Sequence, residues 1–555
     1  MKDSTKKVLA GTGKTLDDRF GGASTLRKQM KKLFPDHWSF MLGEIALYSF
    51  VILLLTGIFL TFFYKPSIEH VIYNGSYLKL EGIPMSEAYK STIDLSLEVR
   101  GGLLMRQIHH WAALLFVASI MVHMFRIFFT GAFRKPREVN WLIGITLFIL
   151  AMLEGFAGYT LPDDLLSGVG LRIFVSVTFM AIPIVGTYLM YFAFGGGFPD
   201  GLAGEFIPRL YIVHVLLVPG ILLALIGAHM MIMWHQKHTT WASAKQTNKN
   251  TVGVPFFPHF MAKTGAFFMF VFGVLALFGT FVQINPIWMY GPYNPAHVTA
   301  GAQPDWYIGI LEGGLRIMPG VETNLFGHTI AWTTLVPALV VPGILFTFIG
   351  AYPFLEKWIT KDKNEHHVLD RPRNVPTRTG IGVAWITVYL VLWIAGGNDI
   401  IADVFSLSVN SLTWFFRFAI FLLPVAAFVV TKRICIGMQR REQNLLHHGV
   451  ETGVIKRTPS GGYVEIHREL SPEARGTIEA TAPAAPEELT QLTDEHGVES
   501  KHRLLGRLRV SAQRWYSQDN VVRDGNGHGN GHGPAEGDGH AVEGEERKEL
   551  TGSPD

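Results

Sequence analysis

The stretch RQIHHWAALLFVASIMVHMFR, Arg106–Arg126, is mostly apolar but carries His109 and His123, fourteen residues apart. An α-helix rises about 1.5 Å and turns about 100° per residue, so this spacing puts both imidazoles on one face of a helix, about 21 Å apart. A second apolar stretch, Leu210–Trp234, carries His214 and His229, fifteen residues apart. Ionisable side chains inside apolar spans are rare and are functional candidates by default.

Composition indicates an all-α membrane protein. Of the 555 residues, 48% are apolar and only 17% are charged, whereas an average soluble domain has about 25% charged residues. Mean hydropathy is +0.25 although the C-terminal tail is polar. These values exclude a soluble globular enzyme and a disordered chain. The single cysteine, Cys435, excludes an internal disulfide, a Cys-ligated iron–sulfur cluster and thioether-bound haem.

Charge placement fixes the number of membrane crossings. If a ninth apolar stretch, Leu171–Phe194, does not cross, the basic loops fall on the side of the N-terminus and the acidic loops on the other, the positive-inside pattern. We therefore expect this stretch to form a helical hairpin at the acidic, outer surface, with the basic surface facing inward. The eight predicted spans are Ile45–Phe63, Leu103–Phe129, Trp141–Leu161, Leu210–Trp234, Gly265–Ile284, Thr329–Leu355, Gly380–Ile394 and Leu412–Val430.

The histidines then form two pairs at matching depth. Both histidine-bearing spans run inward, which puts His109 and His214 near the outer end and His123 and His229 near the inner end. Two such pairs suit two six-coordinate haems stacked along the membrane normal. The alternative is four buried histidines satisfied by hydrogen bonds. His110, about 100° around the helix from His109, is expected to line the pocket and not to bind a metal.

Glycines and arginines near the histidines agree with this interpretation. Two further spans each carry glycines fourteen residues apart, where a porphyrin edge could press on the backbone; the alternative is close helix packing. Arginines at the interfacial ends could pair with haem propionates, although snorkelling arginines are also common there. The glycines are Gly43, Gly57, Gly144 and Gly158, and the arginines are Arg106, Arg126 and Arg209.

Four motifs carry a resemblance to a known family: R-Q-I-H (Arg106–His109), H-M-F-R (His123–Arg126), G-Y-T-L-P (Gly158–Pro162) and P-D-W-Y (Pro304–Tyr307). With the glycine pairs, they resemble the cytochrome b subunits of cytochrome bc (quinol:cytochrome c oxidoreductase) complexes over residues 35–435. The resemblance implies eight transmembrane helices, with two non-covalent b haems in a bundle of the first four. It implies a low-potential outer haem on His109 and His214, a high-potential inner haem on His123 and His229, and two quinone sites on opposite sides.

The resemblance is greatest to actinobacterial members. It implies menaquinol as the reductant, a Rieske iron–sulfur subunit, a di-haem cytochrome c subunit and a terminal cytochrome c oxidase, in a dimeric complex of the plasma membrane that binds no nucleic acid. Both termini would be cytoplasmic, and quinol oxidation would contribute to the proton gradient.

The outer quinol site is expected at Pro304, Asp305, Trp306 and Tyr307, between these residues and the Leu171–Phe194 hairpin. Asp305 would accept a proton, Tyr307 would hydrogen-bond or gate, and Trp306 would pack. Most members have glutamate where Asp305 stands, and L-P-D-D-L follows Tyr159 in place of L-P-W-G-Q. At the inner site, Trp234 and Thr264 replace a histidine and an aspartate of many members, so the inner candidates here are His235, His238 and Lys263.

The chain is divided into an N-terminal cytoplasmic segment (1–35), a di-haem domain (36–240), a second four-helix domain with the outer quinol loop (241–435) and a polar, partly disordered tail (436–555). The tail includes a Gly/His/Asn run, Gly525–His540.

Two other functions remain as alternatives. A di-haem anchor of a dehydrogenase would lack P-D-W-Y and the later spans, and a secondary transporter is disfavoured because no inverted repeat is detectable.

Overall fold

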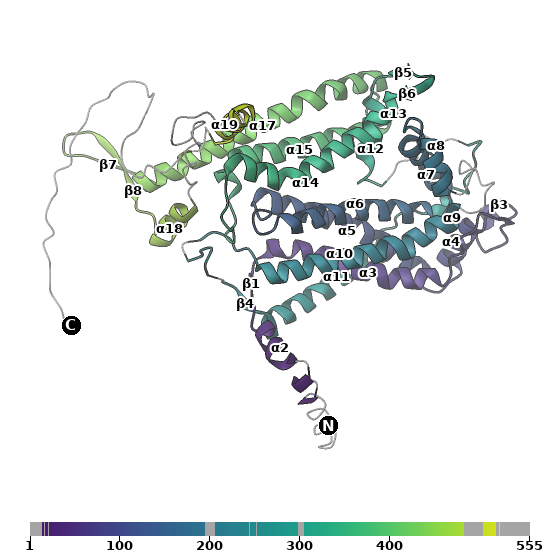
Figure 1. The fold of residues 1–555 in the computed structure, drawn as a ribbon, viewed down its shortest axis with the longest axis horizontal. Helices are drawn as coiled ribbons and strands as arrows, with labels where there is room; N and C mark the ends of the chain where they lie inside the picture. The colour runs from purple at the N-terminus through teal and green to yellow at the C-terminus, as the bar shows by residue number, and fades with distance from the viewer. Residues whose placement is uncertain are drawn as a thin grey trace.

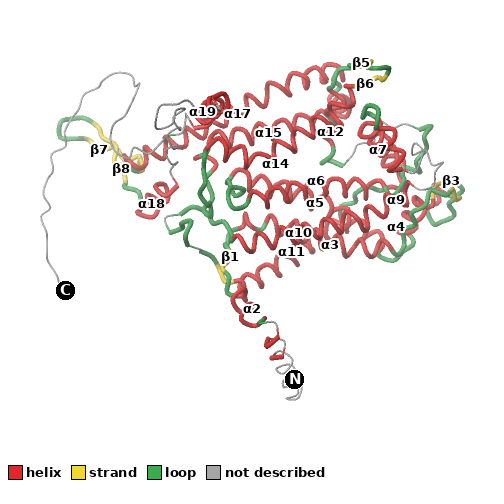
Figure 2. Tube along the Cα trace, in the orientation of Figure 1, coloured by secondary structure: helices red, strands yellow, loops and turns green. Residues whose placement is uncertain are grey.

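The computed structural model describes residues 14–15, 17–19, 21–194, 206–243, 245–250, 252–297, 305–481, 503–517 and 521. Eight helical runs in this part of the chain are long and apolar enough to cross a membrane, and they lie roughly side by side (Figures 1 and 2). The predicted fold class is thereby confirmed. The runs are α3 (Leu42–Thr61), α5 (Gly102–Phe129), α6 (Glu138–Thr160), α9–η4–α10 (Phe206–Ile212, Val213–Leu217, Val218–Gln236), η5–α11 (Phe256–Phe260, Met261–Phe281), α13–η7–α14 (Trp332–Leu335, Val336–Val340, Val341–Thr360), α15 (Pro376–Ala395) and α17 (Val409–His448).

The first four runs form the bundle that holds the histidines. α5 packs along α3, and α10 packs along α6. α11, which follows the predicted boundary at residue 240, packs on α3 and α5 from outside, through buried residues such as Ile108 and Leu275. α14, α15 and α17 lie on the other side of α5 and α6 (Figure 1), and Phe128, Trp141 and Tyr352 belong to the buried cluster there.

The ninth apolar stretch is a helical hairpin, as expected, built from α7 (Leu165–Val175), η3 (Ser176–Met180) and α8 (Gly186–Phe194). Asp164 caps the N-terminus of α7, because its Oδ2 accepts hydrogen bonds from the backbone N–H groups of Leu166 at 3.1 Å and Ser167 at 3.3 Å. Asp163 lies 3.5 Å from Arg172 of α7. The unusual L-P-D-D-L segment therefore begins the hairpin.

Shorter elements cover both ends of the spans. Among the described residues there are four sheets, each antiparallel and two-stranded: β1 (Leu33–Phe34) with β4 (Val254–Pro255), β2 (His70–Ile72) with β3 (Pro84–Ser86), β5 (Glu322–Leu325) with β6 (His328–Ala331), and β7 (Val450–Arg457) with β8 (Tyr463–Arg468). The remaining α-helices are α2 (Gly22–Met30), α4 (Glu87–Leu97), α12 (Gly309–Ile317), α16 (Asn398–Phe405), α18 (Pro472–Thr481) and α19 (Arg503–Ser517). Single 3₁₀ turns are η1 (Trp38–Phe40), η2 (Leu78–Leu80), η6 (Ile287–Met289) and η8 (Pro372–Asn374).

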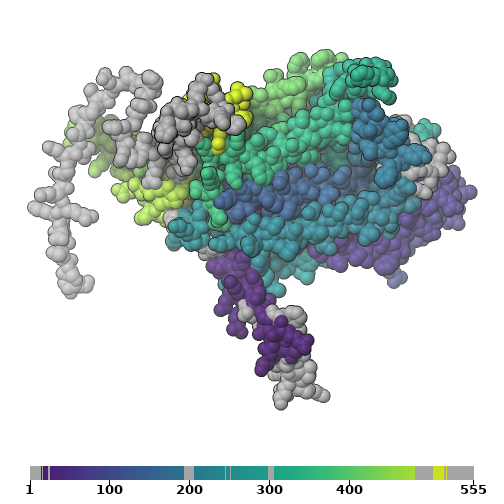
Figure 3. All heavy atoms as spheres, in the orientation of Figure 1, coloured from purple at the N-terminus to yellow at the C-terminus, as the bar shows by residue number. Residues whose placement is uncertain are grey.

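The C-terminal tail has defined structure in its described part. α17 continues beyond its apolar run to His448, and the β7–β8 ribbon, α18 and α19 follow. The Gly/His/Asn run lies outside the described residues. α19 returns to the inner end of the last spans (Figures 1 and 3), so the tail is tied to the membrane domain.

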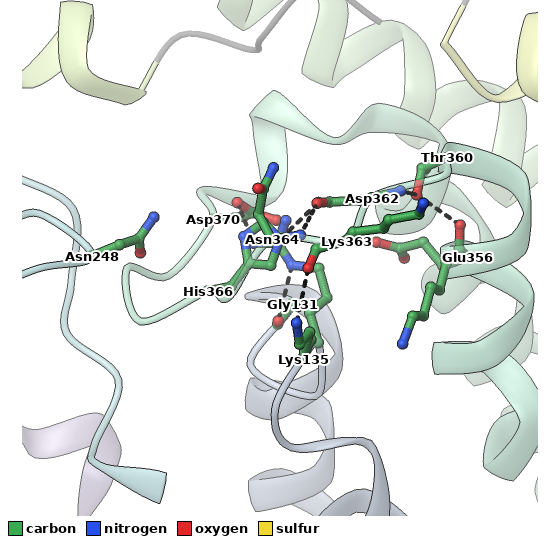
Figure 4. A network of polar contacts seen from close by, with 12 residues as sticks. Gly131, Lys135, Asn248, Glu356, Thr360, Asp362, Lys363, Asn364, His366 and Asp370 are labelled. Atoms are coloured by element: carbon green, nitrogen blue, oxygen red, sulfur yellow. Dashed lines mark hydrogen bonds and ion pairs between the residues drawn. The ribbon is translucent and has the colours of Figure 1, made fainter. Parts of the chain in front are cut away.

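An ion network joins the two groups of helices at the inner end (Figure 4). Arg378 is 2% exposed and contacts Glu356 of α14 at 2.5 Å and Asp370 at 2.8 Å. Asp370 also pairs with Arg134, in the turn between α5 and α6, at 2.7 Å. In the same region the backbone N–H of His366 donates to the carbonyl O of Lys135. These contacts fix the α5–α6 turn to the α14–α15 loop.

Replacing Arg378 with methionine is expected to destabilise the protein by about 3–5 kcal/mol, because Glu356 would keep a buried charge with no partner. The thermal unfolding midpoint of the purified protein measures this loss. Arg441→Met, at an exposed position of α17, is the matched control and should leave the midpoint unchanged. Equal midpoints for both variants would mean that the network does not stabilise the fold.

Candidate functional site

The two outer histidines face each other inside the first bundle. His109 lies on α5 and His214 in η4, and their ring centroids are 6.4 Å apart with planes inclined by 79°. Two metal–nitrogen bonds of about 2 Å, together with two imidazoles of about 1.2 Å radius, span about 6.4 Å. The pair therefore has the spacing that one metal ion between two imidazoles requires.

The two outer histidines differ in the surroundings of Nδ1. The hydroxyl of Thr56 donates to the carbonyl O of Ile52 at 2.7 Å, so its oxygen accepts from Nδ1 of His109 at 2.9 Å. Because a neutral imidazole carries one proton, His109 keeps an unprotonated Nε2, which is the form that binds a metal. Nδ1 of His214 lies 2.9 Å from Oε1 of Glu154, a carboxylate within α6, but without the geometry of a hydrogen bond.

The inner histidines lie on the same two helical runs. Nδ1 of His123 and Nδ1 of His229 are both buried, and neither has a hydrogen-bond partner among the described residues. Buried polar atoms are normally hydrogen-bonded, so these rings are not structural histidines that the protein itself satisfies. Each of these two rings therefore keeps one buried nitrogen that no described residue satisfies.

Each predicted glycine faces one of the histidines. The space beside each glycine is occupied by an imidazole ring, whereas we expected a porphyrin edge there. The reason is that the glycine-bearing helices α3 and α6 are the direct neighbours of the histidine-bearing runs. An added Cβ would clash with the ring of His214 and press on the rings of His109 and His123, whereas at Gly144 it would make an ordinary contact with His229. The distances from an added Cβ atom to the imidazole Cε1 are 3.3 Å for Gly57 and His109, 3.2 Å for Gly43 and His123, 2.5 Å for Gly158 and His214, and 3.9 Å for Gly144 and His229.

The unequal spacing of the two histidine pairs follows from η4. Pro219 has no N–H to donate to the carbonyl of Val215, and the chain forms a π-helical turn around His214. A π-turn contains one residue more than an α-turn. Fifteen residues in this run therefore cover about the same rise as fourteen in α5, and His229 reaches the depth of His123.

Two of the three predicted arginines are buried near the histidines. Arg106 is 8% exposed and lines the cavity of the outer pair. Nε and Nη2 of Arg126 are buried without a hydrogen-bond partner among the described residues, as expected of a cation that pairs with a bound anion. Arg209 is exposed and donates to the carbonyl O of Phe192 in the hairpin at 3.1 Å. The structure therefore does not bring Arg209 to the outer histidines.

One cavity connects the outer histidines to the P-D-W-Y segment. It encloses about 1490 Å³ of space between atoms, including its opening to solvent. Its lining includes His109, His110, Glu154, His214 and Asp305. The hairpin contributes none of the residues that line it, so this cavity differs from the expected quinol position between P-D-W-Y and the hairpin.

Asp305 is positioned by a tyrosine and faces a histidine. Oδ2 of Asp305 accepts from the phenol of Tyr307 at 2.8 Å, and Oδ1 lies 3.7 Å from Nε2 of His110. Tyr307 is fully buried, and Gly155 leaves room for it, since a Cβ there would lie 2.2 Å from the phenol oxygen. Burial and the charge of Asp305 raise the pKa of Tyr307 well above its usual value, so its phenol remains a hydrogen-bond donor.

The rest of the P-D-W-Y segment contributes less. Trp306 packs against the main apolar cluster, which agrees with the packing role expected for it. Pro304 lies outside the described residues.

The inner-site candidates have different surroundings. The ring of His238 packs against Phe34, with centroids 4.2 Å apart and planes inclined by 49°, and its Nε2 is buried without a partner among the described residues. Burial lowers the pKa of His238 to about 4. Lys263 forms an ion pair with Asp36, and His235 is exposed. His238 is therefore the candidate with a buried imidazole nitrogen that no described residue satisfies.

Sequence reasoning missed Glu154 and Thr56 and gave His110 no role beyond the pocket wall. Glu154 could have been found, because a carboxylate inside an apolar span is itself a functional signal, and it lies one helical turn before Gly158. Thr56 had no such signal, since threonines are common in membrane helices. The contact of His110 with Asp305 depends on how residue 305 folds back onto α5, which spacing along one helix cannot predict.

Comparisons with known proteins point to one family. A family model described as "Cytochrome b(N-terminal)/b6/petB" matches residues 114–292. The cytochrome bc1 complex cytochrome b subunit of Streptomyces coelicolor is 53% identical over 91% of this chain and 92% of its own length. The proteins of the same name from Mycobacterium leprae and Corynebacterium diphtheriae are 53% and 52% identical over 84% of this chain, and over 84% and 85% of their own lengths.

A solved structure supports the fold. A chain of the "Hyperthermophilic respiratory Complex III" has a TM-score of 0.57 and 22% identity, and the match covers 75% of this chain and 98% of that one.

Proposed function

This chain belongs to the family of cytochrome b subunits of cytochrome bc1 complexes, and from that premise we propose that it holds two b haems and oxidises quinol at its outer end. It is a multi-pass membrane protein and a b-haem subunit of a quinol–cytochrome c reductase. The outer haem would be held by His109 and His214, and the inner haem by His123 and His229. The main supporting observation is the outer pair, whose ring centroids lie 6.4 Å apart inside the first bundle.

Haem, when bound, supplies a one-electron redox centre. The residues of the chain hold it and shape its surroundings. The two imidazoles of each pair would bind the iron, and glycines leave room for their rings. Arg106 and Arg126 offer buried guanidinium groups to the propionates. Thr56 keeps the proton of the His109 imidazole on Nδ1.

Quinol oxidation would use the cavity beside the outer pair. Asp305 faces the cavity, and its Oδ1 is free to accept a proton from a quinol hydroxyl, since Tyr307 hydrogen-bonds to Oδ2. His110 lines the same cavity, with Nε2 3.7 Å from Oδ1, and would take that proton onward. The buried Tyr307 holds the carboxylate in place. Protons leaving by this route would be released at the outer surface.

The inner quinone site would lie at the other end of the bundle, near His238, with Lys263 and His235 closer to solvent. We further propose menaquinone as the quinone, and a Rieske subunit, a di-haem cytochrome c subunit and a terminal oxidase as partners in a dimeric complex. The chain would lie in the plasma membrane with both termini in the cytoplasm. Residues 36–240 would form the di-haem unit, and 241–435 the remainder of the membrane domain.

Mixing the purified complex with a reduced menaquinone analogue tests the proposal. We expect the b-type α-band to appear in the reduced-minus-oxidised spectrum, because quinol electrons reach the haems. A complex without this band, or one that only dithionite reduces, would contradict quinol oxidation by this chain.

Glu154→Gln is expected to raise the midpoint potential of the outer haem. The carboxylate makes the imidazole of His214 more electron-rich and so favours the oxidised iron, whereas an amide does so less. Redox titration of haem absorbance measures the shift. Glu69→Gln removes an exposed carboxylate at the outer end and is the control. An unchanged potential in Glu154→Gln would show that this contact does not tune the haem.

A further inference from the structure

An amphipathic helix of the C-terminal tail is anchored to the inner end of the last spans. The hydroxyl of Thr377, at the start of α15, donates to the carbonyl O of Tyr516 at 2.8 Å. The indole of Trp515 stacks on Phe428 of α17, with ring centroids 5.8 Å apart and planes inclined by 9°. Tyr516 is buried. These contacts hold the last turn of α19 against the membrane domain.

Two contacts indicate the depth of α19 in the membrane. The ammonium of Lys432, just beyond the apolar run of α17, lies 5.8 Å from the ring centroid of Trp515. The guanidinium of Arg509 lies 5.9 Å from the ring of Trp358, in the last turn of α14. At these positions the spans change from apolar to charged sequence, and tryptophans are typical of the membrane–water interface. α19 therefore lies at the level of the lipid headgroups, on the surface of the protein (Figure 3).

α19 has three faces. One face, with Gln513 and Tyr516, is buried against the spans. A second face is apolar and open, since Leu504, Leu505 and Leu508 are 74%, 58% and 55% exposed. The third face is basic.

The basic face consists of Arg507 and Arg514, both exposed. They are seven residues apart, which differs from two full turns by only about 20°. No ion pair joins either arginine to another described residue. The two guanidinium groups are therefore available to an anion outside the chain.

We propose that α19 binds anionic phospholipids of the inner leaflet. Leucines that are exposed at this depth meet acyl chains, which is how an in-plane amphipathic helix attaches to a bilayer. Arg507 and Arg514 then reach the phosphates of the headgroups, whose negative surface potential attracts basic side chains. An acidic protein partner would account for the exposed arginines of α19. It would not account for the exposed leucines at the depth where the acyl chains begin.

Hydrogen exchange of the full complex in nanodiscs tests this proposal. Amides of residues 503–517 are compared in phosphatidylcholine alone and in a mixture with phosphatidylglycerol. We expect exchange about 30-fold slower in the mixture, the factor that two basic side chains near an anionic surface supply. Arg507→Gln/Arg514→Gln should abolish the difference. Arg457→Gln/Arg468→Gln removes two exposed arginines of the β7–β8 ribbon and should preserve it.

Three outcomes would overturn the proposal. The first is equal exchange in both lipids for the unmodified complex. The second is an equal loss of protection in both double variants, which would mean that overall charge and not α19 is responsible. The third is the same protection produced by inorganic phosphate in phosphatidylcholine nanodiscs, which would identify a free anion as the ligand. Since haem content is not part of the readout, the result is independent of the proposed function.

Discussion

His123→Ala is expected to lower the b-haem content of the complex from two per chain to one, with loss of the inner haem alone. In the described part of the chain, the buried Nδ1 atoms of the inner imidazoles have no hydrogen-bond partner that would hold the rings in place. His123 and His229 would hold the inner haem together, and alanine cannot bind the iron in place of His123. Haem extraction and quantification per protein chain measure this loss.

His110→Ala is the matched control for that variant. His110 is also a histidine of α5, but it faces Asp305 at 3.7 Å, and its removal should leave both haems bound. If His123→Ala retained two haems, or if His110→Ala lost one, the assignment of ligands along α5 would be wrong.

Asp305→Asn is expected to slow quinol oxidation by about 10²–10⁴-fold, the range that positioned general bases contribute. The amide keeps the size of the side chain but cannot take up the quinol proton. Both haems should stay bound and should still be reduced by dithionite. Stopped-flow measurement of haem reduction by quinol gives the rate.

Asp403→Asn removes another outer-end carboxylate, exposed at the end of α16, and should leave the rate unchanged. A normal rate in Asp305→Asn would remove Asp305 from the proton route. Loss of haem in that variant would instead give it a structural role.

The sequence was sufficient for the fold and for bringing His109 and His214 together, because both depend on periodicity and hydropathy. Charge asymmetry alone was enough to exclude a ninth crossing at Leu171–Phe194. The contact that Arg209 makes could not be predicted from the sequence. It depends on how the hairpin folds back and places the carbonyl O of Phe192 beside the guanidinium group. The π-turn at His214 was not predicted from the sequence either, although Pro219, which causes it, is visible there.

The other features that the sequence could not predict depend on contacts between elements that are distant along the chain. The surroundings of Nδ1 in the outer histidines depend on Thr56 and Glu154, which come from α3 and α6 and are brought together only by packing. The structure of the tail is a second example. Its polar composition indicated a partly disordered tail but could not place α19, which Arg509, Trp515 and Tyr516 fix to three spans that lie far away in the sequence.

Redox titration of haem absorbance in the purified, unmodified complex tests the central claim most directly. Two bis-imidazole sites in different surroundings, only one of which has the carboxylate of Glu154 beside a ligand, should give two one-electron b-type components with separate midpoint potentials. A single component, or no b-type absorbance, would contradict the assignment of His109 with His214 and of His123 with His229.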